Sequence, residues 1–374
     1  MVIPERVNEM LEKTAEISRI FQDAGKELYL VGGTVRDLIL SGDTPAGSSG
    51  QQAAKDYDFA TNALPDEILA LVAGWAESVW TQGKRFGTIA CLKDGVRFEI
   101  TTYRAEKYSR DTRKPAVAFG DSLEEDLARR DFTINSMALA LPSLELADPY
   151  GGLPDLASNT LRTPMAAEKL FDDDPLRMLR AARFIAGYHL KAVDEINAAV
   201  SKMADRIDMV SPERVRDELD KLLTVQKPSP GLAFLVDTGL AARILPELPA
   251  LALEQDPIHR HKDVLAHTLA VVDNASPERI LRLAALFHDI GKPSTRSYSA
   301  QGVSFYHHDV VGARITRERM KKLRYSTEDI ATVSRLVELH LRFHTYRFGW
   351  TDSALRRYVR DAGALLGRLN ELTR

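Results

Sequence analysis

Two aspartates one residue apart, Asp56 and Asp58, are the clearest candidates for chemistry in this sequence. They alternate with Tyr57 and Phe59, which is the pattern of a strand with one polar and one apolar face, so both carboxylates are expected on the same side. Two adjacent carboxylates repel each other, and a divalent cation relieves that repulsion. Hard cations such as Mg²⁺ take oxygen ligands and commonly keep a substrate phosphate among them. The pair therefore predicts a metal-binding site for phosphate chemistry.

The stretch before the aspartates supplies donors for such a phosphate. An apolar run over residues 28–31 meets Gly32 and Gly33, and Arg36 follows within an amphipathic segment. This order predicts a strand, a tight loop and a helix N-terminus, whose free backbone N–H groups suit a phosphate. A glycine pair or a lone Asp-x-Asp is more often structural. The combination in this order is what indicates a nucleotide site.

The string Gly32-Gly33-x-Val35-Arg36-Asp37 followed by Asp56-x-Asp58 resembles the head of the class II nucleotidyltransferases, the family of bacterial CCA-adding enzymes and poly(A) polymerases. The connection between the two parts is longer than usual for that family. The Gly, Ser and Pro content of this 41–55 insertion predicts a flexible surface loop that leaves the site intact.

A second matching motif ends the charged run over residues 124–131. In the family, an arginine of this motif meets the triphosphate and an aspartate meets the sugar, so the resemblance gives those roles to Arg130 and Asp131. It likewise implies that Gly32, Gly33 and Arg36 hold phosphates.

The family's Glu-Asp-x-x-Arg motif matches Asp173-Asp174-x-x-Arg177, and Arg180 and Arg183 match positions that touch nucleotide. On a helix, Asp174, Arg177 and Arg180 would line one face. Cytosine and adenine both present an amino donor beside a ring-nitrogen acceptor, which a carboxylate and a guanidinium match, whereas guanine and uracil do not. The pair Asp174 and Arg177 is therefore expected to select CTP and ATP without a template, because a mismatch leaves desolvated groups unpaired. An acidic helix start with i,i+3 ion pairs is the alternative.

Two segments between these motifs leave alternatives open. Glu99 lies on the polar face of an alternating run, and if that strand neighbours Asp58 it is either a third carboxylate or the cross-strand partner of a basic residue. Residues 104–119 resemble the family's flexible loop, which is associated there with the change from adding C to adding A. A solvated surface loop has the same composition.

Histidines and aspartates gather in the last third of the chain. Imidazole and carboxylate together suit a hydrolytic divalent metal. The pattern resembles the HD phosphohydrolase domain, and the resemblance implies the ligands His267, His288 and Asp289, with Asp352 a weaker candidate for the closing aspartate. His308 and His340 could complete a second metal position. A degenerate, purely structural domain is the alternative.

Periodicity and turn residues predict helices over residues 7–24, 65–80, 211–223 and 281–290, and strands over 87–92 and 96–103 joined at Asp94-Gly95. Acidic residues 172–174 and Pro175 are expected in the first turn of a helix that continues through Arg183.

The composition limits how this protein can bind RNA and in which compartment it is expected. The 374 residues carry a net charge of only −3, so RNA binding must rest on local basic patches, of which residues 314–324 and 356–360 are the best. Ion-paired helices would look the same. A single cysteine, Cys91, excludes an intramolecular disulfide, and no long apolar segment occurs, which predicts a soluble cytoplasmic protein.

The resemblance predicts an α+β fold: a polymerase-β-like nucleotidyltransferase head with a mixed sheet (1–160), an all-α neck for base recognition (161–240) and a helical HD domain with the start of the C-terminal helices (241–374). The family normally runs on into helices that hold tRNA, so weakened RNA binding is expected of a chain that stops at Arg374.

The implied function is addition of CCA to the 3′ end of tRNA from CTP and ATP, with two Mg²⁺ ions on Asp56 and Asp58 and pyrophosphate leaving. The alternatives are a CC-adding, A-adding or poly(A) polymerase activity, a metal phosphohydrolase with an inactive head, and a non-catalytic RNA-binding module. The sequence leaves open the oligomeric state and the metal and substrate of the HD domain.

Overall fold

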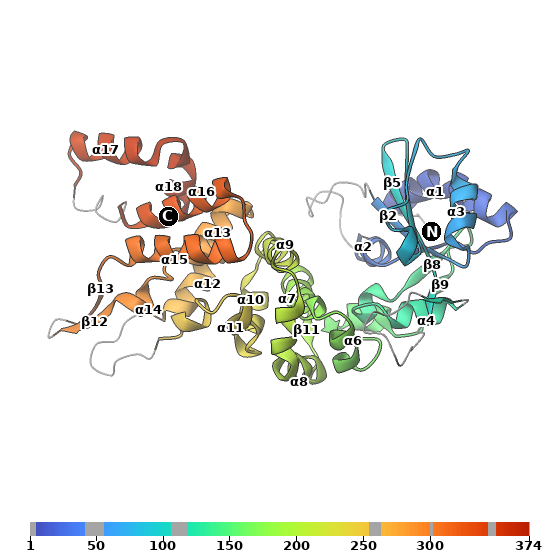
Figure 1. Ribbon diagram of the computed structural model, residues 1–374, viewed down its shortest axis with the longest axis horizontal. Coiled ribbons are helices and arrows are strands. Elements are labelled where there is room, and N and C mark those ends of the chain that lie inside the picture. The colour runs from blue at the N-terminus through green and yellow to red at the C-terminus, as the bar shows by residue number, and fades with distance from the viewer. Residues whose placement is uncertain are drawn as a thin grey trace. The chain divides into compact units, whose positions relative to one another are not determined.

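The computed structural model describes residues 5–41, 56–105, 118–120, 122–253, 263–299, 302–342 and 349–373. The chain divides into two compact units, Met1–Ala166 and Ala167–Arg374 (Figure 1). Residues 42–55 of the expected insertion and 106–117 of the expected loop lie outside the described residues. The predicted boundary at residue 240 between a helical neck and the HD domain stays a prediction.

A mixed sheet forms the first unit. Its strands follow the order β3 (Ser78–Trp80), β4 (Thr88–Lys93), β5 (Val96–Thr102), β2 (Asp56–Thr61), β1 (Tyr29–Val31), β8 (Ala138–Ala140) and β9 (Leu146–Ala147). β2 and β5 are parallel, and the other pairs are antiparallel. The predicted turn between β4 and β5 is confirmed, with φ of 49° at Asp94 and 73° at Gly95.

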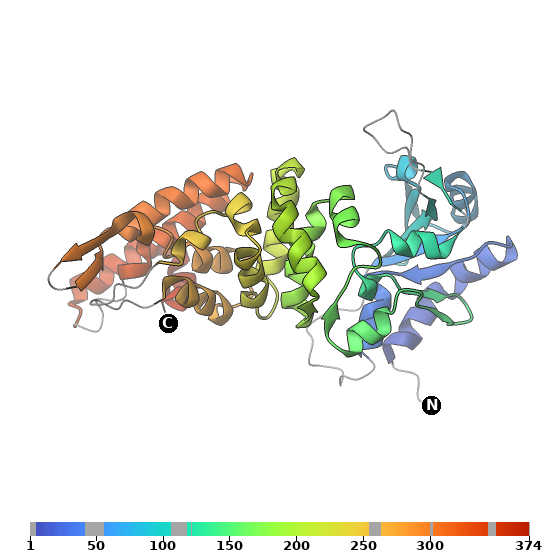
Figure 2. The same cartoon turned by 90° about the horizontal axis from the view of Figure 1, so that it is seen from below.

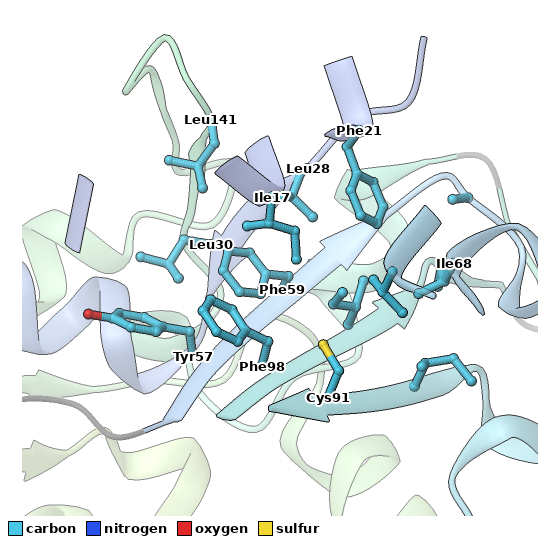
Figure 3. Packing of buried hydrophobic residues seen from close by; sticks show 14 of the residues in the cluster. Ile17, Phe21, Leu28, Leu30, Tyr57, Phe59, Ile68, Cys91, Phe98 and Leu141 are labelled. Atoms are coloured by element: carbon cyan, nitrogen blue, oxygen red, sulfur yellow. The ribbon is translucent and has the colours of Figure 1, made fainter. Parts of the chain in front are cut away.

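One face of this sheet is the core of the unit. Tyr57 and Phe59 of β2 pack with Phe98 of β5, and the rings of Phe59 and Phe98 stack with centroids 6.0 Å apart. Ile17 and Phe21 of α1 (Glu5–Asp23) belong to the same cluster (Figure 3). Each such side chain contributes roughly 1.5–3 kcal/mol through burial, so the apolar face of β2 is fixed inward.

The helix predicted over residues 65–80 is wrong beyond Val72. α3 spans Pro65–Val72, and the chain then turns so that Trp75 is buried, with its Nε1 donating to Glu16 at 2.8 Å. Residues Ser78–Trp80 pair with β4 as an edge strand. Pairing with a neighbouring strand overrides a weak local helical pattern.

Short elements complete the first unit. They are α2 (Gly33–Ser41), α4 (Leu123–Ala128), α5 (Gly152–Ala157), β6 (Arg104–Ala105), β7 (Ala118–Phe119) and β10 (Thr160–Leu161), with 3₁₀ turns at Lys84–Phe86 and Thr133–Asn135.

The second unit is helical. Its helices are α6 (Ala167–Asp173), α7 (Leu176–Tyr188), α8 (Asp194–Met203), α9 (Pro212–Leu223), α10 (Ser229–Asp237), α11 (Leu240–Ile244), α12 (Val264–Asn274), α13 (Arg279–Phe287), α14 (Lys292–Thr295), α15 (His308–Lys322), α16 (Thr327–Leu339), α17 (Asp352–Ala362) and α18 (Leu366–Leu372). The two-residue β11 (Lys191–Ala192) lies between α7 and α8, and the hairpin of β12 (Arg296–Ser299) and β13 (Gly302–Phe305) extends away from the helices (Figure 2). None of the described helices combines the length and apolar character that a membrane span requires.

Two details of this unit bear on the site. The acidic residues 172–174 do not open α7 as predicted, because α6 ends at Asp173 and Pro175 is the N-cap of α7. The residue before a proline is biased away from helical conformation, so the helix breaks at Asp174. The predicted helix 211–223 is confirmed as α9, capped by Ser211. The helix predicted over 281–290 is confirmed only as far as Phe287, because the buried α13 spans Arg279–Phe287 and residues 288–290 form turns.

Candidate nucleotide and metal sites

Asp56 and Asp58 project from the exposed face of β2, while Tyr57 and Phe59 are buried. The register places Asp58 directly beside Glu99 of the parallel strand β5. Although the Asp58 side chain reaches solvent, partial burial, together with the negative charges of Glu99 and Asp56, raises its pKa above the ordinary value. Crowded carboxylates of this kind favour a bound divalent cation, and their oxygen donors fit a hard one.

Glu99 satisfies parts of both interpretations that the sequence left open. It is the neighbour of Asp58, yet its carboxylate also forms an ion pair with Arg97. Arg97 belongs to the same strand, so this ion pair is not the cross-strand one that the second alternative describes. Both side chains are partly exposed, which leaves Glu99 accessible beside the aspartates.

The two glycines allow arginines to approach the backbone. Gly32 has φ of +71°, and a Cβ on it would lie 3.1 Å from Nη1 of Arg130. A Cβ on Gly33, the first residue of α2, would lie 3.2 Å from Nη2 of Arg36. Two guanidinium groups therefore pack against the loop at the start of α2, where anions bind well.

A chain of hydrogen bonds orders the residues behind this loop. Nη1 of Arg36 donates to Oδ1 of Asn135 at 2.6 Å, and Nδ2 of Asn135 donates to Oδ1 of Asp131 at 2.9 Å. All three side chains are buried. The structure thus brings together Arg36 and Asp131 through Asn135, a residue for which the motifs predict no role.

Arg130 keeps an unused donor. Its Nη2 donates to Oδ2 of Asp126 at 3.2 Å, but its buried Nε has no hydrogen-bond partner within the part of the chain that the structure describes. A buried cationic donor beside Gly32 suits an anionic ligand.

In the second unit, Asp174 and Arg177 have other partners. Nη2 of Arg214 donates to Oδ2 of Asp174 at 3.0 Å, while Nη1 of Arg177 donates to the carbonyl oxygen of Leu170 at 3.1 Å. The backbones of the two predicted base-reading residues are linked, because the N–H of Arg177 donates to the Asp174 carbonyl oxygen at 3.0 Å.

Glu218 of α9 anchors the remaining arginines of α7. Its buried carboxylate lies 2.8 Å from Nε of Arg183, 3.2 Å from Nζ of Lys221 and 3.9 Å from Nη1 of Arg180. Burial alone would raise the pKa of Glu218, but these cations outweigh that effect and lower it. Sequence analysis missed this role, since Glu218 is far from α7 in the sequence and looks like any other charge of an amphipathic helix.

Five of the candidate ligands of the C-terminal region converge. Two overlapping groups have ligand atoms within 4.8 Å of one another, and they consist of His267, His288 and Asp289, and of Asp289, His308 and His340. Among the described residues these are the only such groups, and Asp352 is in neither: it is exposed at the start of α17.

The histidines are oriented for a metal. Three of them point Nδ1 at the carbonyl oxygen three residues earlier, with distances of 2.7 Å for His288 to Ala285, 2.7 Å for His308 to Phe305 and 2.6 Å for His340 to Val337. This arrangement leaves each Nε2 for a metal ion. The buried Nε2 atoms of His308 and His340 have no hydrogen-bond partner among the residues that the structure describes, so this donor set fits a divalent metal.

Asp289 is the centre of the cluster. Burial alone would raise its pKa, but His288, His308 and Lys292 overcome this effect and hold the pKa well below the usual range. Nζ of Lys292 lies 2.7 Å from Oδ2 of Asp289. Burial, with a smaller contribution from the neighbouring His288, lowers the pKa of His340 to about 3, which keeps its imidazole neutral as a metal ligand requires. A pocket of about 1120 Å³ opens over the cluster.

Part of the predicted basic patch on α15 is ion-paired. Arg319 binds Glu247, with Nε to Oε2 at 2.9 Å, and Nη1 of Arg314 lies 3.0 Å from Glu318. The alternative of an ion-paired helix therefore describes these two residues.

Three family models match consecutive parts of the chain. Residues 28–162 match the poly A polymerase head domain, residues 193–251 match a probable RNA and SrmB-binding site of polymerase A, and residues 264–366 match the HD domain. Proteins described as CCA-adding enzymes are similar in sequence: one from Geobacillus sp. (strain WCH70) is 36% identical over 235 residues, and one from Levilactobacillus brevis is 38% identical over 237. The predicted resemblance is confirmed: the chain matches the poly A polymerase head, RNA-binding and HD domain models, and its sequence relatives are described as CCA-adding enzymes.

The similarity to these family members has a defined extent. Each alignment covers 63% of this chain, but only 54% of the Geobacillus protein and 56% of the Levilactobacillus protein. The chain thus matches little more than half the length of these relatives.

Solved structures of family members share the fold. A Bacillus stearothermophilus CCA-adding enzyme, solved in complex with CTP, matches with a TM-score of 0.69 at 23% identity, over 97% of this chain and 78% of that one. A CCA-adding enzyme solved with ATP matches with a TM-score of 0.58 at 19% identity, over 98% and 83%. The predicted family, its mixed-sheet head and its HD domain are confirmed.

Proposed function

We propose that this chain adds CCA to the 3′ end of tRNA, using CTP and ATP without a template. The observation that carries the proposal is the parallel pairing of β2 with β5, which sets Asp56, Asp58 and Glu99 together on the exposed face of the head. The names of the relatives and of the solved complexes with CTP and ATP support the same substrates.

Different residues of the head bind the metal, the triphosphate and the sugar. Asp56 and Asp58 would hold Mg²⁺, which supplies charge stabilisation for the phosphates and activation of a hydroxyl when bound. Arg36 and Arg130, packed against Gly33 and Gly32, orient the triphosphate for in-line attack on its α-phosphate. Asp131, held through Asn135, faces the sugar.

Base choice is assigned to the second unit. Asp174 accepts from the amino group of cytosine or adenine, and Arg177 donates to the ring nitrogen. Arg214 holds the Asp174 carboxylate, and Glu218 holds Arg180 and Arg183, so α9 orders the groups that read the base.

The one thiol, Cys91, is buried and free, which fits a reducing cytoplasm.

The test uses labelled CTP and ATP, Mg²⁺, and three tRNA substrates that end before CCA, after C and after CC. Addition that completes CCA on all three and then stops supports the proposal. Activity on only one end would assign a CC-adding or A-adding enzyme, and a long A tail would assign a poly(A) polymerase. No incorporation on any end would overturn it.

We propose a second activity for the histidine cluster, the metal-dependent hydrolysis of a phosphate ester. The observation that favours it is the set of imidazole Nε2 atoms around Asp289 beneath an open pocket. Lys292 at the same pocket offers a cation for the phosphate. Hydrolysis of a chromogenic phosphomonoester or phosphodiester with added Mn²⁺, lost in His288→Ala, would support it. Metal binding without hydrolysis would leave the cluster a structural metal site.

A further inference from the structure

A row of directly paired residues crosses the sheet of the head. Trp80 of β3 pairs with Ala90 of β4, Ala90 pairs with Glu99 of β5, and Glu99 pairs with Asp58 of β2. Side chains that face each other across neighbouring strands point to the same side of a sheet. Trp80 therefore shares the face of the metal-holding Asp58, three strands away, or roughly 14 Å at the usual strand spacing.

The neighbouring row shows that the row from Trp80 to Asp58 does not face the main hydrophobic cluster of the unit. Val79, Cys91, Phe98 and Tyr57 pair in the same way, one residue along each strand. Cys91, Phe98 and Tyr57 are almost completely buried, and they point into the hydrophobic cluster (Figure 3). Because side chains alternate, the row from Trp80 to Asp58 must face the other way.

A pocket of about 600 Å³ lies over this row. Its lining includes Trp80, Phe86, Ala90 and Glu99 together with Arg97 and Arg104. Trp80 is 39% exposed and Phe86 is 46% exposed, so two aromatic rings are accessible in one place. Neither ring is needed for the hydrophobic core of the unit.

One cation of the pocket, Arg104, is available to a polyanion that carries bases, because Glu99 at the same pocket pairs with Arg97. Arg104 is held in position, because its Nε donates to the carbonyl oxygen of Phe86 at 3.0 Å and its Nη2 donates to Oγ1 of Thr88 at 3.2 Å. Among the described residues, no carboxylate forms an ion pair with its guanidinium. Exposed aromatic rings beside arginines are the common means of binding single-stranded nucleic acid without reading its sequence.

We propose that the pocket over Trp80 holds the single-stranded 3′ end of the RNA acceptor, with a base stacked on Trp80 and a phosphate on Arg104. The proposal rests on the proposed function, because it takes the carboxylate row as the place of transfer. The last few nucleotides of a strand can span the distance from Asp58 to Trp80. The pocket therefore binds nucleotides of the acceptor on the 5′ side of its reacting 3′-hydroxyl.

The first test compares KM values for the two substrates. Trp80→Ala should raise the KM for a tRNA that ends before CCA by about fivefold to a hundredfold, the range of base–aromatic stacking, and leave the KM for CTP unchanged. Trp80→Phe keeps a ring and should retain most of the affinity. Tyr298→Ala, which removes an exposed ring of the other unit, is the matched control. An unchanged KM for tRNA, or a raised KM for CTP alone, overturns the proposal.

The second test needs no catalysis. A single-stranded oligonucleotide with the sequence of the tRNA 3′ end, titrated without nucleotides, should quench tryptophan fluorescence of the wild type. Trp80→Phe should bind the same oligonucleotide, measured by anisotropy of a labelled strand, with that quenching lost. If the wild type adds no nucleotides, the proposed function fails, but this titration still tests whether the pocket binds the RNA 3′ end. Quenching that persists in Trp80→Phe overturns the assignment of the pocket.

Discussion

The two candidate metal sites hold their charged groups in opposite ways. In the head, Asp56 and Asp58 are exposed neighbours, two residues apart on one strand. In the second unit, Asp289 is only 2% exposed, and imidazoles from α12, α15 and the ends of α13 and α16 surround it. The head site is a surface pair of like charges, whereas the cluster is a buried mixture of a carboxylate, imidazoles and Lys292.

The difference teaches what each site can tolerate. Like charges at a surface destabilise the fold slightly, and a cation that carries a phosphate can bind between them. A neutral substitution there should therefore lower the activity without lowering the free energy of unfolding. A buried carboxylate paired with cations is part of the fold, so its removal affects both. The predictions below separate these two behaviours.

The largest effect is expected at the buried cluster. Asp289→Asn leaves Lys292 and the histidines without their central negative charge, which should lower the free energy of unfolding by about 3–5 kcal/mol. Metal content measured after dialysis against Mn²⁺ should fall as well, while the head still adds nucleotides at a temperature where the chain remains folded. Asp352→Asn is the control, and it should change neither stability nor metal content. Equal loss of metal in both variants would return Asp352 to the ligand set.

Asp58→Asn should act on chemistry alone. Incorporation of CTP should fall by at least about a hundredfold, the scale of removing one charge-stabilising group from an active site, because the amide leaves a single carboxylate for the cation. The thermal unfolding midpoint should not fall, since a repulsion has been removed. Asp66→Asn, at an exposed carboxylate of the same unit, should keep full activity. Retained turnover in Asp58→Asn would sink the metal assignment.

Glu218→Gln tests a third way of holding charge, in which one buried acid orders several cations. The substitution leaves Arg183, Arg180 and Lys221 without their shared partner and should cost about 1–3 kcal/mol of unfolding free energy. The KM values for CTP and ATP should also rise, because α7 loses the group that positions its arginines. Glu213→Gln changes an exposed acid of the same helix and should have neither effect. A stability loss with unchanged KM values would make Glu218 structural only.

The metal-free cluster should make stability depend on pH. The pKa of His340 is lowered to about 3 in the folded chain, below its ordinary value of 6.5. As the pH falls below 6.5 the unfolded chain takes up this proton and the folded chain does not, so stability is complete above that pH and is lost by up to about 1.4 kcal/mol per pH unit below it. Denaturant unfolding in EDTA between pH 7 and pH 5 should show this slope, and His340→Gln should flatten it. Identical slopes would contradict the assignment.

The smallest effect is expected at Glu99. Burial raises the pKa of Asp58 first, and the charge of Glu99 raises it further. Glu99→Gln should therefore lower the pKa of Asp58 and move the acidic limb of the activity profile to lower pH, by less than about one unit. A collapse of kcat at every pH would instead identify Glu99 as a required third carboxylate.

Sequence patterns predicted what depends on near neighbours. Alternation along one strand was enough to put Asp56 and Asp58 on the exposed face, and the Asp94-Gly95 dipeptide was enough to predict a hairpin. The pattern failed where a distant strand or a proline decided the outcome, as at Ser78–Trp80, which became an edge strand, and at Asp174, which lies between two helices.

By itself, then, the sequence carried the motifs that resemble the family and determined the face on which Asp56 and Asp58 lie, because motifs and strand alternation involve residues close together in the chain. Only the tertiary structure decided which charges meet. Arg214 reaches Asp174, Glu218 reaches Arg183, and His308 and His340 reach Asp289 without Asp352. Such contacts join residues tens of positions apart. They form because the packing of apolar helix and sheet faces brings the attached charged side chains close together.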